Sequence, residues 1–278
     1  MKRIRSASLV GILALCCLVP AALADEGPLD ASQPRGITPD EIIQRFAAKE
    51  KEFKEAYDQY GYRESAKMQT LDGDTVDGEF QEVFDVSFDD QGRRVKNVVF
   101  APLPTLVRLG MTREDYDDLE NGFPMVLTSD DISQYSVLYA GQQQEDELHC
   151  YVFDIAPKQI EKNKRYFQGR IWVDDHDFQI VKTYGQMVPE TRAKKGRGNE
   201  NLFPKFTTWR QQIDDKYWFP VYTRADDTLH FSTQDVKIRE IVKYENYKRF
   251  GANVKITYDG KEVQKGTDPN AKPQPPQK

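Results

Sequence analysis

Four adjacent residues near the middle of the chain, Asp174-Asp175-His176-Asp177, carry side chains that could bind a metal ion or transfer a proton. They lie between two stretches in which apolar and polar residues alternate, which is typical of neighbouring β-strands. Aspartate is favoured in the turns between strands because its carboxylate hydrogen-bonds to the local backbone. The position of these residues therefore favours a hairpin turn, and we expect no metal ion to bind here.

Two other patterns could also do chemistry. The stretch Asp72-Gly-Asp-Thr-Val-Asp-Gly resembles a calcium-binding loop, but Val76 stands at the fifth position, where an oxygen ligand is needed. His149 and Cys150 could act as base and nucleophile, but adjacent residues of a strand point to opposite faces. We therefore expect neither a cofactor nor an enzymatic activity. Catalysis by a carboxylate pair stays an alternative, because 45 acidic residues offer many pairs and the sequence singles out none.

The stretches around the Asp174 turn form a predicted hairpin, Tyr166–Pro189. We expect Val173 to pair with Phe178 across the turn, so that Ile171 pairs with Ile180. A shift of one residue would mix the apolar and polar faces, so this register should be well specified. The apolar face would then consist of Phe167, Ile171, Val173, Phe178 and Ile180.

The hairpin sequence Phe-x-Gly-x-Ile-Trp-Val-Asp-x-x-Asp-Phe-x-Ile-Val, from Phe167 to Val181, resembles the central hairpin of LolA/LolB-like periplasmic lipoprotein carriers. The resemblance implies a half-open barrel that binds lipid or the acyl chains of lipoproteins, with membrane-associated donor and acceptor proteins as partners. It also implies an arginine that holds a helical lid closed, which we assign to none of Arg63, Arg93 and Arg170.

The first 24 residues have the parts of a secretory signal peptide: basic residues from Lys2 to Arg5, a short apolar run, and Ala22-Leu23-Ala24 before the cleavage site. The apolar run is too short to span a membrane. Cys16 and Cys17 lie in this segment, but Leu15 stands where a lipoprotein signal has a small residue. We therefore expect cleavage before Asp25 and export across the inner membrane, most simply to the periplasm.

After this cleavage, 36 basic residues would remain against 45 acidic ones, a net charge of −9 that argues against a nucleic-acid partner. Cys150 would be the remaining cysteine, so the core must hold the fold without a disulfide. We expect a flexible leader over residues 25–37, one domain over residues 38–262, and a disordered Pro- and Gln-rich tail over residues 263–278.

Within this domain, Thr38 and Glu41 form a capping box that begins a helix running from Pro39 to about Gln59. Its apolar stripe is expected opposite a charged face that includes Glu50. A second, short helix is predicted at Thr112–Asn121. Strands with a period of two residues are expected at Tyr62–Leu71, Glu79–Phe88, Arg93–Phe100, Tyr135–Tyr139, His149–Ile155, Lys205–Ile213, Tyr217–Arg224, Thr228–Asp235, Ile238–Tyr244 and Val254–Tyr258.

These elements predict a mainly β (α+β) fold, a strongly curved antiparallel sheet or half-open β-barrel with the two helices as a lid. Such a cavity needs apolar area and shape, and no reactive groups. We expect its lipid-binding residues among Phe84, Phe167, Ile171, Trp172, Phe178, Ile180, Trp209 and Trp218. The predicted function is a periplasmic carrier of hydrophobic ligands. The alternative is an envelope interaction or stress-sensor protein on the same scaffold, which would bind a membrane partner through an exposed apolar patch.

Overall fold

The computed structural model describes residues 26–89, 91, 93–110, 127–162, 164–189, 191–193, 199–201, 203–250, 257–258 and 261–262. The expected signal peptide, the second helix and the C-terminal tail lie outside these residues. The elements are α1 (Pro39–Tyr57), β1 (Tyr60–Asp72), β2 (Thr75–Phe88), β3 (Arg94–Phe100), the 3-10 turn η1 (Ile132–Gln134), β4 (Tyr135–Glu145), β5 (Leu148–Pro157), β6 (Tyr166–Asp174), β7 (Ile180–Val188), β8 (Thr191–Ala193), β9 (Asn199–Asn201), β10 (Phe206–Ile213), β11 (Tyr217–His230), β12 (Asp235–Arg249), β13 (Thr257–Tyr258) and β14 (Lys261–Glu262).

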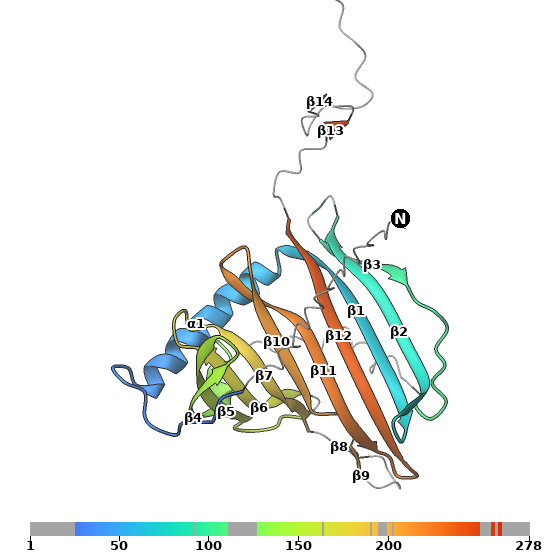
Figure 1. Ribbon diagram of the computed structural model, residues 1–278, viewed down its shortest axis with the longest axis horizontal. Helices are drawn as coiled ribbons and strands as arrows, with labels where there is room; N and C mark the ends of the chain where they lie inside the picture. Colours follow the sequence, from blue (N-terminus) through green and yellow to red (C-terminus); the bar gives the residue numbers. More distant parts are fainter. Residues whose placement is uncertain are drawn as a thin grey trace, which may run out of the picture.

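Ten strands form the body of one antiparallel sheet in the order β3-β2-β1-β12-β11-β10-β7-β6-β5-β4. β9 pairs with β11 and β8 of this sheet, and β13 and β14 pair separately with each other. The sheet is open, because its edge strands β3 and β4 do not pair with each other in this order. Figure 1 shows α1 crossing the half of the sheet that contains β5, β6, β7 and β10, while the long strands β1, β2 and β12 extend past the helix. The predicted curved, half-open antiparallel sheet with an N-terminal helix is confirmed.

The helix begins as predicted. The Thr38 side chain accepts a hydrogen bond from the Glu41 backbone at 3.3 Å, and the Glu41 carboxylate accepts one from the Thr38 backbone at 2.9 Å. The prediction for Glu50 is wrong, because this carboxylate lies on the buried face of α1. Its position, four residues after Phe46 and three before Phe53, places it in the apolar stripe.

The predicted register of the central hairpin is also wrong. Val173 pairs with Ile180, and Ile171 pairs with Thr183. The expected faces nevertheless hold, because Phe178 packs against the same apolar cluster as Ile171 and Ile180. The side-chain pattern was therefore sufficient to assign the face of the five apolar residues, whereas the pairing depends on the length of the turn.

The turn is longer than predicted because Asp174 organises it. Its carboxylate accepts hydrogen bonds from the backbone N–H groups of His176 and Asp177 at 3.2 and 2.9 Å. Phe178 adopts a positive φ of 59° at the end of the turn. Pairing therefore resumes at Ile180, and the acidic cluster has the local backbone role that is typical of aspartate in turns.

Strand β11 is one continuous element, whereas the sequence predicted separate strands at Tyr217–Arg224 and Thr228–Asp235. The predicted interruption covers Asp226 and Asp227, which lie inside β11. Asp226 accepts a hydrogen bond from Arg239 of the neighbouring β12 at 2.8 Å and forms an ion pair with Arg224. Cross-strand charge pairs of this kind let acidic residues remain within a strand.

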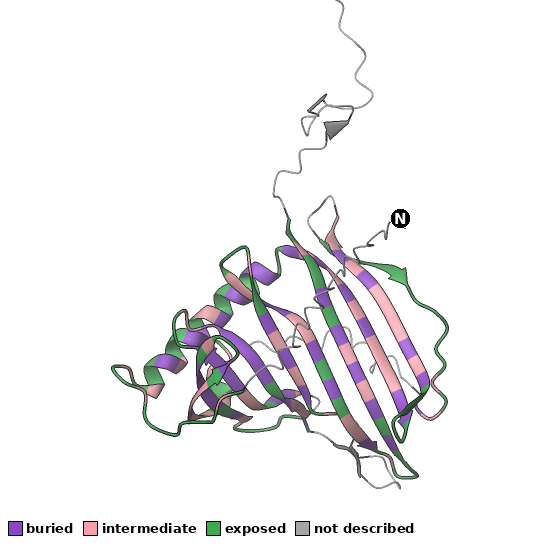
Figure 2. Ribbon diagram, in the orientation of Figure 1, coloured by how far each residue is buried: buried purple, intermediate pink, exposed green. Residues whose placement is uncertain are grey.

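Burial alternates along the long strands, as Figure 2 shows for β1 and β12. Buried residues on the face that carries α1 form two large apolar clusters, one under the N-terminal half of the helix and one under its C-terminal half. A smaller cluster of Cys150, Val152, Trp172 and Val181 lies on the opposite face. We call the face under α1 the inner face and the opposite one the outer face.

Candidate functional site

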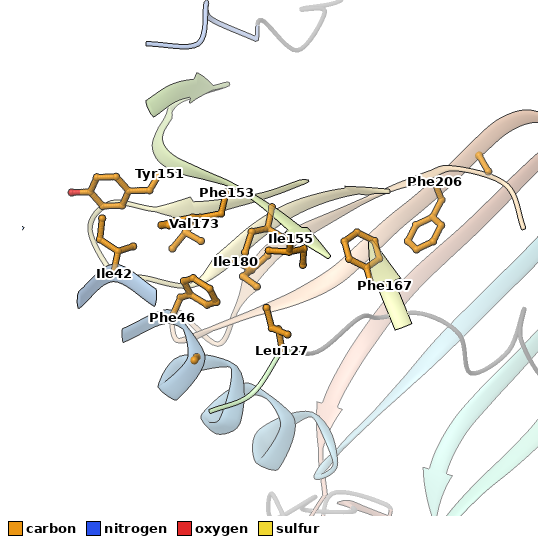
Figure 3. Close-up of a cluster of buried hydrophobic side chains, with 13 residues drawn as sticks. Ile42, Phe46, Leu127, Tyr151, Phe153, Ile155, Phe167, Val173, Ile180 and Phe206 are labelled. Atoms are coloured by element: carbon orange, nitrogen blue, oxygen red, sulfur yellow. The ribbon is translucent and has the colours of Figure 1, made fainter. Parts of the chain in front are cut away.

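The first inner-face cluster joins α1 to the central hairpin. Figure 3 shows Ile42 and Phe46 of α1 pointing toward Phe153, Val173 and Ile180 of the sheet. The Phe46 and Phe153 rings lie 5.6 Å apart, measured between centroids. Three predicted lipid-binding residues, Phe167, Ile171 and Ile180, are fully buried in this cluster, and Phe178 is partly buried at its margin.

Two glycines allow the hairpin strands to approach closely beneath this cluster. Gly169 pairs with Gly185 across β6 and β7. A Cβ atom on Gly169 would lie 2.2 Å from the carbonyl oxygen of Tyr184, and one on Gly185 would lie 2.7 Å from the tip of the Phe167 ring. The glycine in the hairpin motif therefore makes room for the backbone of the partner strand.

The second inner-face cluster continues the apolar surface toward β1, β2 and β12. Phe53 and Tyr57 of α1 pack around Phe219, with ring centroids 5.6 and 5.3 Å from it. The predicted lipid-binding residue Phe84 of β2 is buried in the same cluster. Apolar side chains therefore line the inner face both at the central hairpin and at β1, β2 and β12.

A buried ion pair fastens α1 to this face. The Arg210 guanidinium of β10 donates hydrogen bonds to the two carboxylate oxygens of Glu50 at 2.6 and 3.1 Å, and both side chains are 1% exposed. The guanidinium also lies 4.4 Å from the centre of the Phe53 ring. Sequence reasoning did not identify Arg210. The available signal was an acidic residue inside the apolar stripe of α1, which requires a buried cation nearby.

The three arginines considered for this lid contact have other partners. Arg63 forms an ion pair with Asp85 of the neighbouring strand, and Arg170 forms one with Asp154. Arg93 pairs with Asp89 in the turn between β2 and β3. Arg210, by contrast, forms its ion pair with Glu50 of α1.

The segment after β3 lies against the far end of the inner face. Thr105 donates its backbone N–H to the carbonyl of Glu79 at 2.8 Å, and Arg108 forms an ion pair with Asp77 at 2.6 Å. Leu106 and Leu109 pack against buried residues of β11 and β12. Leu103 and Val107 of the same segment point away, and Leu103 is 92% exposed.

The three tryptophans lie on the outer face. Trp172 follows the inner-facing Ile171 in β6, so its side chain points to the other side of the sheet. Trp218 packs against the outer cluster and donates its indole N–H to Asp177 at 2.9 Å. Of the eight predicted lipid-binding residues, five lie on the inner face and these three on the outer face. The structure therefore does not bring the eight together into one cluster.

A row of cross-strand neighbours runs over the outer face. Trp172 pairs with Lys182 of β7, Lys182 pairs with Trp209 of β10, and Trp209 pairs with Tyr222 of β11. Val181 has no partner in this register, so a β-bulge precedes Lys182. The Lys182 ammonium lies 4.7 Å from the Trp172 ring centre and 5.9 Å from that of Trp209.

Lys182 is almost completely buried and has two acidic partners. It donates to Glu145 of β4 at 2.8 Å and to Glu26 of the N-terminal leader. Burial raises the pKa of the Glu145 carboxyl, and the ammonium of Lys182 opposes this shift. The Glu26 side chain is 54% exposed, so it reaches the ammonium from the solvent side.

The leader is held in place by backbone pairing with β4. Asp30 and Gln142 exchange two backbone hydrogen bonds of 2.8 Å, and Gly27 donates to the Gln144 carbonyl at 2.9 Å. Gly141 has a φ of 148°, and a Cβ atom on it would lie 2.3 Å from the Asp30 carbonyl oxygen. A glycine at this position therefore lets the leader approach the edge of the sheet.

A cavity of about 900 Å³ lies over the Trp172–Lys182–Trp209 row, and Glu26 forms part of its wall. Its other walls combine apolar side chains, including Leu138 and Ala156, with amide, hydroxyl and charged ones, including Gln143, Gln168, Arg170, Tyr184, Gln186, Lys205 and Thr207. Gln143 accepts a hydrogen bond from the Trp172 indole at 2.8 Å. Lys182, like Arg210, was missed from sequence, because it is one charged residue in a strand that alternates in polarity.

His149 and Cys150, the two side chains that could perform nucleophilic chemistry, do not face each other. Cys150 is buried, and burial raises the pKa of its thiol, while the neighbouring His149 is exposed on the other side of the strand, as predicted. Among the residues that the structure describes, no group of three or more His, Cys, Asp and Glu side chains is arranged to hold a metal ion. In the same part of the chain, no helix is both long and apolar enough to cross a membrane.

No protein-family model and no curated protein matches the chain. Among solved structures, it is similar to a DUF1329 family protein from Desulfovibrio piger, with 14% identity over 75% of this chain and 92% of that one and a TM-score of 0.35. A LolA superfamily protein from Nitrosomonas europaea matches at 13% identity over 74% and 95%, with a TM-score of 0.31. MucB in complex with MucA(peri) matches at 8% identity over 77% and 99%, with a TM-score of 0.22. The similar structures thus include a LolA superfamily protein, the group that the hairpin motif resembles, and we take no function from them.

Proposed function

We propose that this protein is a periplasmic carrier that binds the acyl chain of a lipid or lipoprotein against the inner face of its sheet, with α1 as the movable cover. The observation that carries the proposal is the apolar surface under α1. It continues from the central hairpin to β2 as two clusters beneath a single helix, and five of the predicted lipid-binding residues belong to it.

The contacts that attach α1 to the sheet support a movement of the helix away from the inner face. Contacts between α1 and the sheet include apolar packing, the Glu50–Arg210 ion pair and the stacking of Arg94 on the Tyr57 ring. Apolar contacts are not directional, so an acyl chain can replace them with a similar gain from burial. Each buried methylene contributes about 0.8 kcal/mol, so one long acyl chain would supply micromolar affinity without a reactive group.

The first test is to purify the protein from a periplasm and identify bound lipid by native mass spectrometry and organic extraction. We expect a stoichiometric lipid or acylated peptide. Uptake of a fluorescent fatty acid would then be measured by stopped flow. A protein that carries no lipid and takes up no fatty acid would contradict the proposal.

A matched pair of variants on α1 tests the role of the helix. Glu50→Gln weakens the buried ion pair and should speed fatty-acid uptake several-fold. Glu52→Gln makes the same change on the exposed side of α1 and should leave uptake unchanged. Equal uptake rates for both variants would mean that α1 is a fixed part of the core.

A second candidate function is the binding of a partner protein, and an exposed apolar stretch favours it. Val98, Val99 and Phe100 of β3 and Leu103 and Val107 after it are all at least half exposed. β3 is an edge strand, and an exposed apolar edge can accept a further strand from a partner. Val99→Lys should abolish cross-linking to one dominant envelope protein. A partner that binds the variant equally well would contradict this function.

A further inference from the structure

We propose that the outer-face cavity is a binding site for an acidic carbohydrate, a hydroxylated ring that carries one carboxylate, and that Glu26 of the leader competes with it for Lys182. This site lies on the opposite side of the sheet from the proposed acyl site and does not depend on it. The proposal follows from the partner of Lys182, from the charge balance of the cavity and from the side chains of its walls.

The contact with Glu26 identifies the charged group of the ligand. Lys182 is already paired with Glu145, which lies beside it and is equally buried. Its second partner, Glu26, belongs to the leader and approaches across the cavity with its side chain half exposed. A carboxylate on a ligand can take the same position, because it presents the same two oxygen acceptors to the ammonium.

The charges around the cavity favour a ligand with a single negative charge. Lys182, Arg170 and Lys205 contribute three positive charges. Glu26, Asp154 and Glu145 contribute three negative charges. When Glu26 withdraws, Lys182 keeps Glu145 as a partner and Arg170 keeps Asp154, so the cavity carries one net positive charge. A ligand carboxylate restores both neutrality and the second acidic partner of Lys182, whereas a neutral ligand restores neither.

The walls of the cavity favour a hydroxylated ring over an acyl chain or an aromatic acid. Trp209 and Tyr184 offer flat aromatic surface on which the C–H face of a sugar ring can pack. Gln168 and Gln186 provide amides that both donate and accept, which suits hydroxyl groups, whereas the Gln143 amide is already bonded to Gly27 and Trp172. An acyl chain would leave these amides without partners, and such groups are costly to bury.

The volume of the cavity and the position of the leader fit this ligand. About 900 Å³ is enough for one or a few sugar rings, since drug-sized ligands occupy pockets of about 300–1,000 Å³. The leader is held at the edge of β4 by backbone hydrogen bonds and by side-chain hydrogen bonds from Tyr139 and Gln143, so withdrawal of Glu26 breaks no hydrogen bond between strands of the sheet. The leader can therefore uncover Lys182 while the cavity floor stays in place.

The test is isothermal titration calorimetry of the purified chain, with any affinity tag at its C-terminus so that the leader is free. The probes are glucuronate and short oligogalacturonates, with glucose and benzoate as comparisons. We expect the two uronates to bind, and glucose and benzoate to bind at least tenfold more weakly. Glu26→Gln should tighten uronate binding by about tenfold, because the competing carboxylate is removed.

Two further variants make the result specific. Asp30→Asn changes a carboxylate on the same leader that hydrogen-bonds to Ser32 and does not contact Lys182, so uronate binding should be unchanged. Trp209→Ala should weaken uronate binding by tenfold or more through the loss of its ring surface. Fatty-acid uptake should be the same in Glu26→Gln as in the wild type, which separates this site from the proposed acyl site.

Several outcomes would overturn the proposal. Equal binding of glucose and glucuronate would show that the ligand carboxylate has no role. Tighter binding of benzoate than of glucuronate would show that the ligand is not a carbohydrate. The absence of uronate binding in both the wild type and Glu26→Gln would show that the cavity is not such a site. An unchanged affinity in Glu26→Gln would show that the leader does not compete.

Discussion

Glu50 of α1 and Arg210 of β10 form a two-bond ion pair in the interior, although 160 positions separate them in the sequence. The pair sits between the two apolar clusters of the inner face and joins the helix to the sheet by opposite charges. Its burial makes it sensitive to the loss of either partner, since a charge that stays behind must be held away from water.

Removal of one partner of this pair should destabilise the fold strongly. We expect Glu50→Ala to lower the free energy of unfolding by about 3–5 kcal/mol, because Arg210 keeps its charge in the interior. The double variant Glu50→Leu, Arg210→Met should recover most of this loss, since two apolar side chains of similar size suit the surrounding clusters. Urea unfolding measures both values, and a double variant no more stable than Glu50→Ala would contradict the expectation.

Ile171 should behave as a core residue in a stability measurement, whatever its role toward a ligand. Ile171 lies in β6 of the hairpin, on the face under α1, and is 0% exposed. Ile171→Ala should therefore lower the free energy of unfolding by about 2–5 kcal/mol. Leu138→Ala provides the control, since Leu138 is 65% exposed on β4 and its loss should change stability by less than about 0.5 kcal/mol. Similar melting temperatures for the two variants would mean that the inner face is not packed as described.

Gly169→Ala should be poorly tolerated although it adds only one methyl group. The added Cβ atom would overlap the backbone of β7, which cannot move as a flexible side chain would. We expect a loss of about 1–3 kcal/mol from overpacking, and more if β6 and β7 separate locally. Gly73→Ala places a methyl group in open space at a turn with positive φ and should cost about 1 kcal/mol from backbone strain alone. A smaller loss in Gly169→Ala than in Gly73→Ala would refute the close approach of the two strands.

Tyr60 should make stability depend on pH in alkaline solution. Burial and its hydrogen bond to Asp214 raise the pKa of the Tyr60 phenol to about 12. In the unfolded chain a tyrosine loses its proton near pH 10. The native state therefore binds this proton more tightly, so its contribution is complete below pH 10 and is lost as the pH rises to about 12.

The variant Tyr60→Phe isolates this contribution from those of the other tyrosines. The stability difference between the wild type and Tyr60→Phe should shrink between pH 10 and 12, by up to about 1.4 kcal/mol per pH unit. Denaturant unfolding at several pH values measures the difference. A constant difference across this range would show that the phenol ionises equally in the folded and unfolded chains.

Local patterns predicted much of the fold. The capping box at Thr38 and Glu41 fixed the start of α1, and alternation assigned the two faces of the central hairpin. The pairing of Val173 escaped prediction because it depends on the hydrogen bonds of Asp174 within the turn. Alternation records which residues share a face, and it carries no information on how many residues a turn contains.

The parts of the site that depend on distant contacts could not be predicted. Lys182 is buried because Glu145 and Glu26 meet it from β4 and from the leader, 37 and 156 positions away in the sequence. Alternation puts Ile171 and Trp172 on opposite faces, but the predicted lipid-binding set included residues of both faces. The topology places Ile171 beneath α1, whereas Trp172 lines the cavity on the outer face.

The pairing of β1 with β12 has a consequence for how the chain folds. Tyr60 pairs with Arg249, so the middle of the sheet joins the first strand to the last long one. Contacts between positions this far apart close a long loop and slow the folding of β-rich proteins. The two halves of the sheet cannot be joined before residues 235–249 have been synthesised, and until then β1 exposes an edge that can aggregate. We therefore expect folding to finish only after synthesis of β12, at a rate that depends on this last strand.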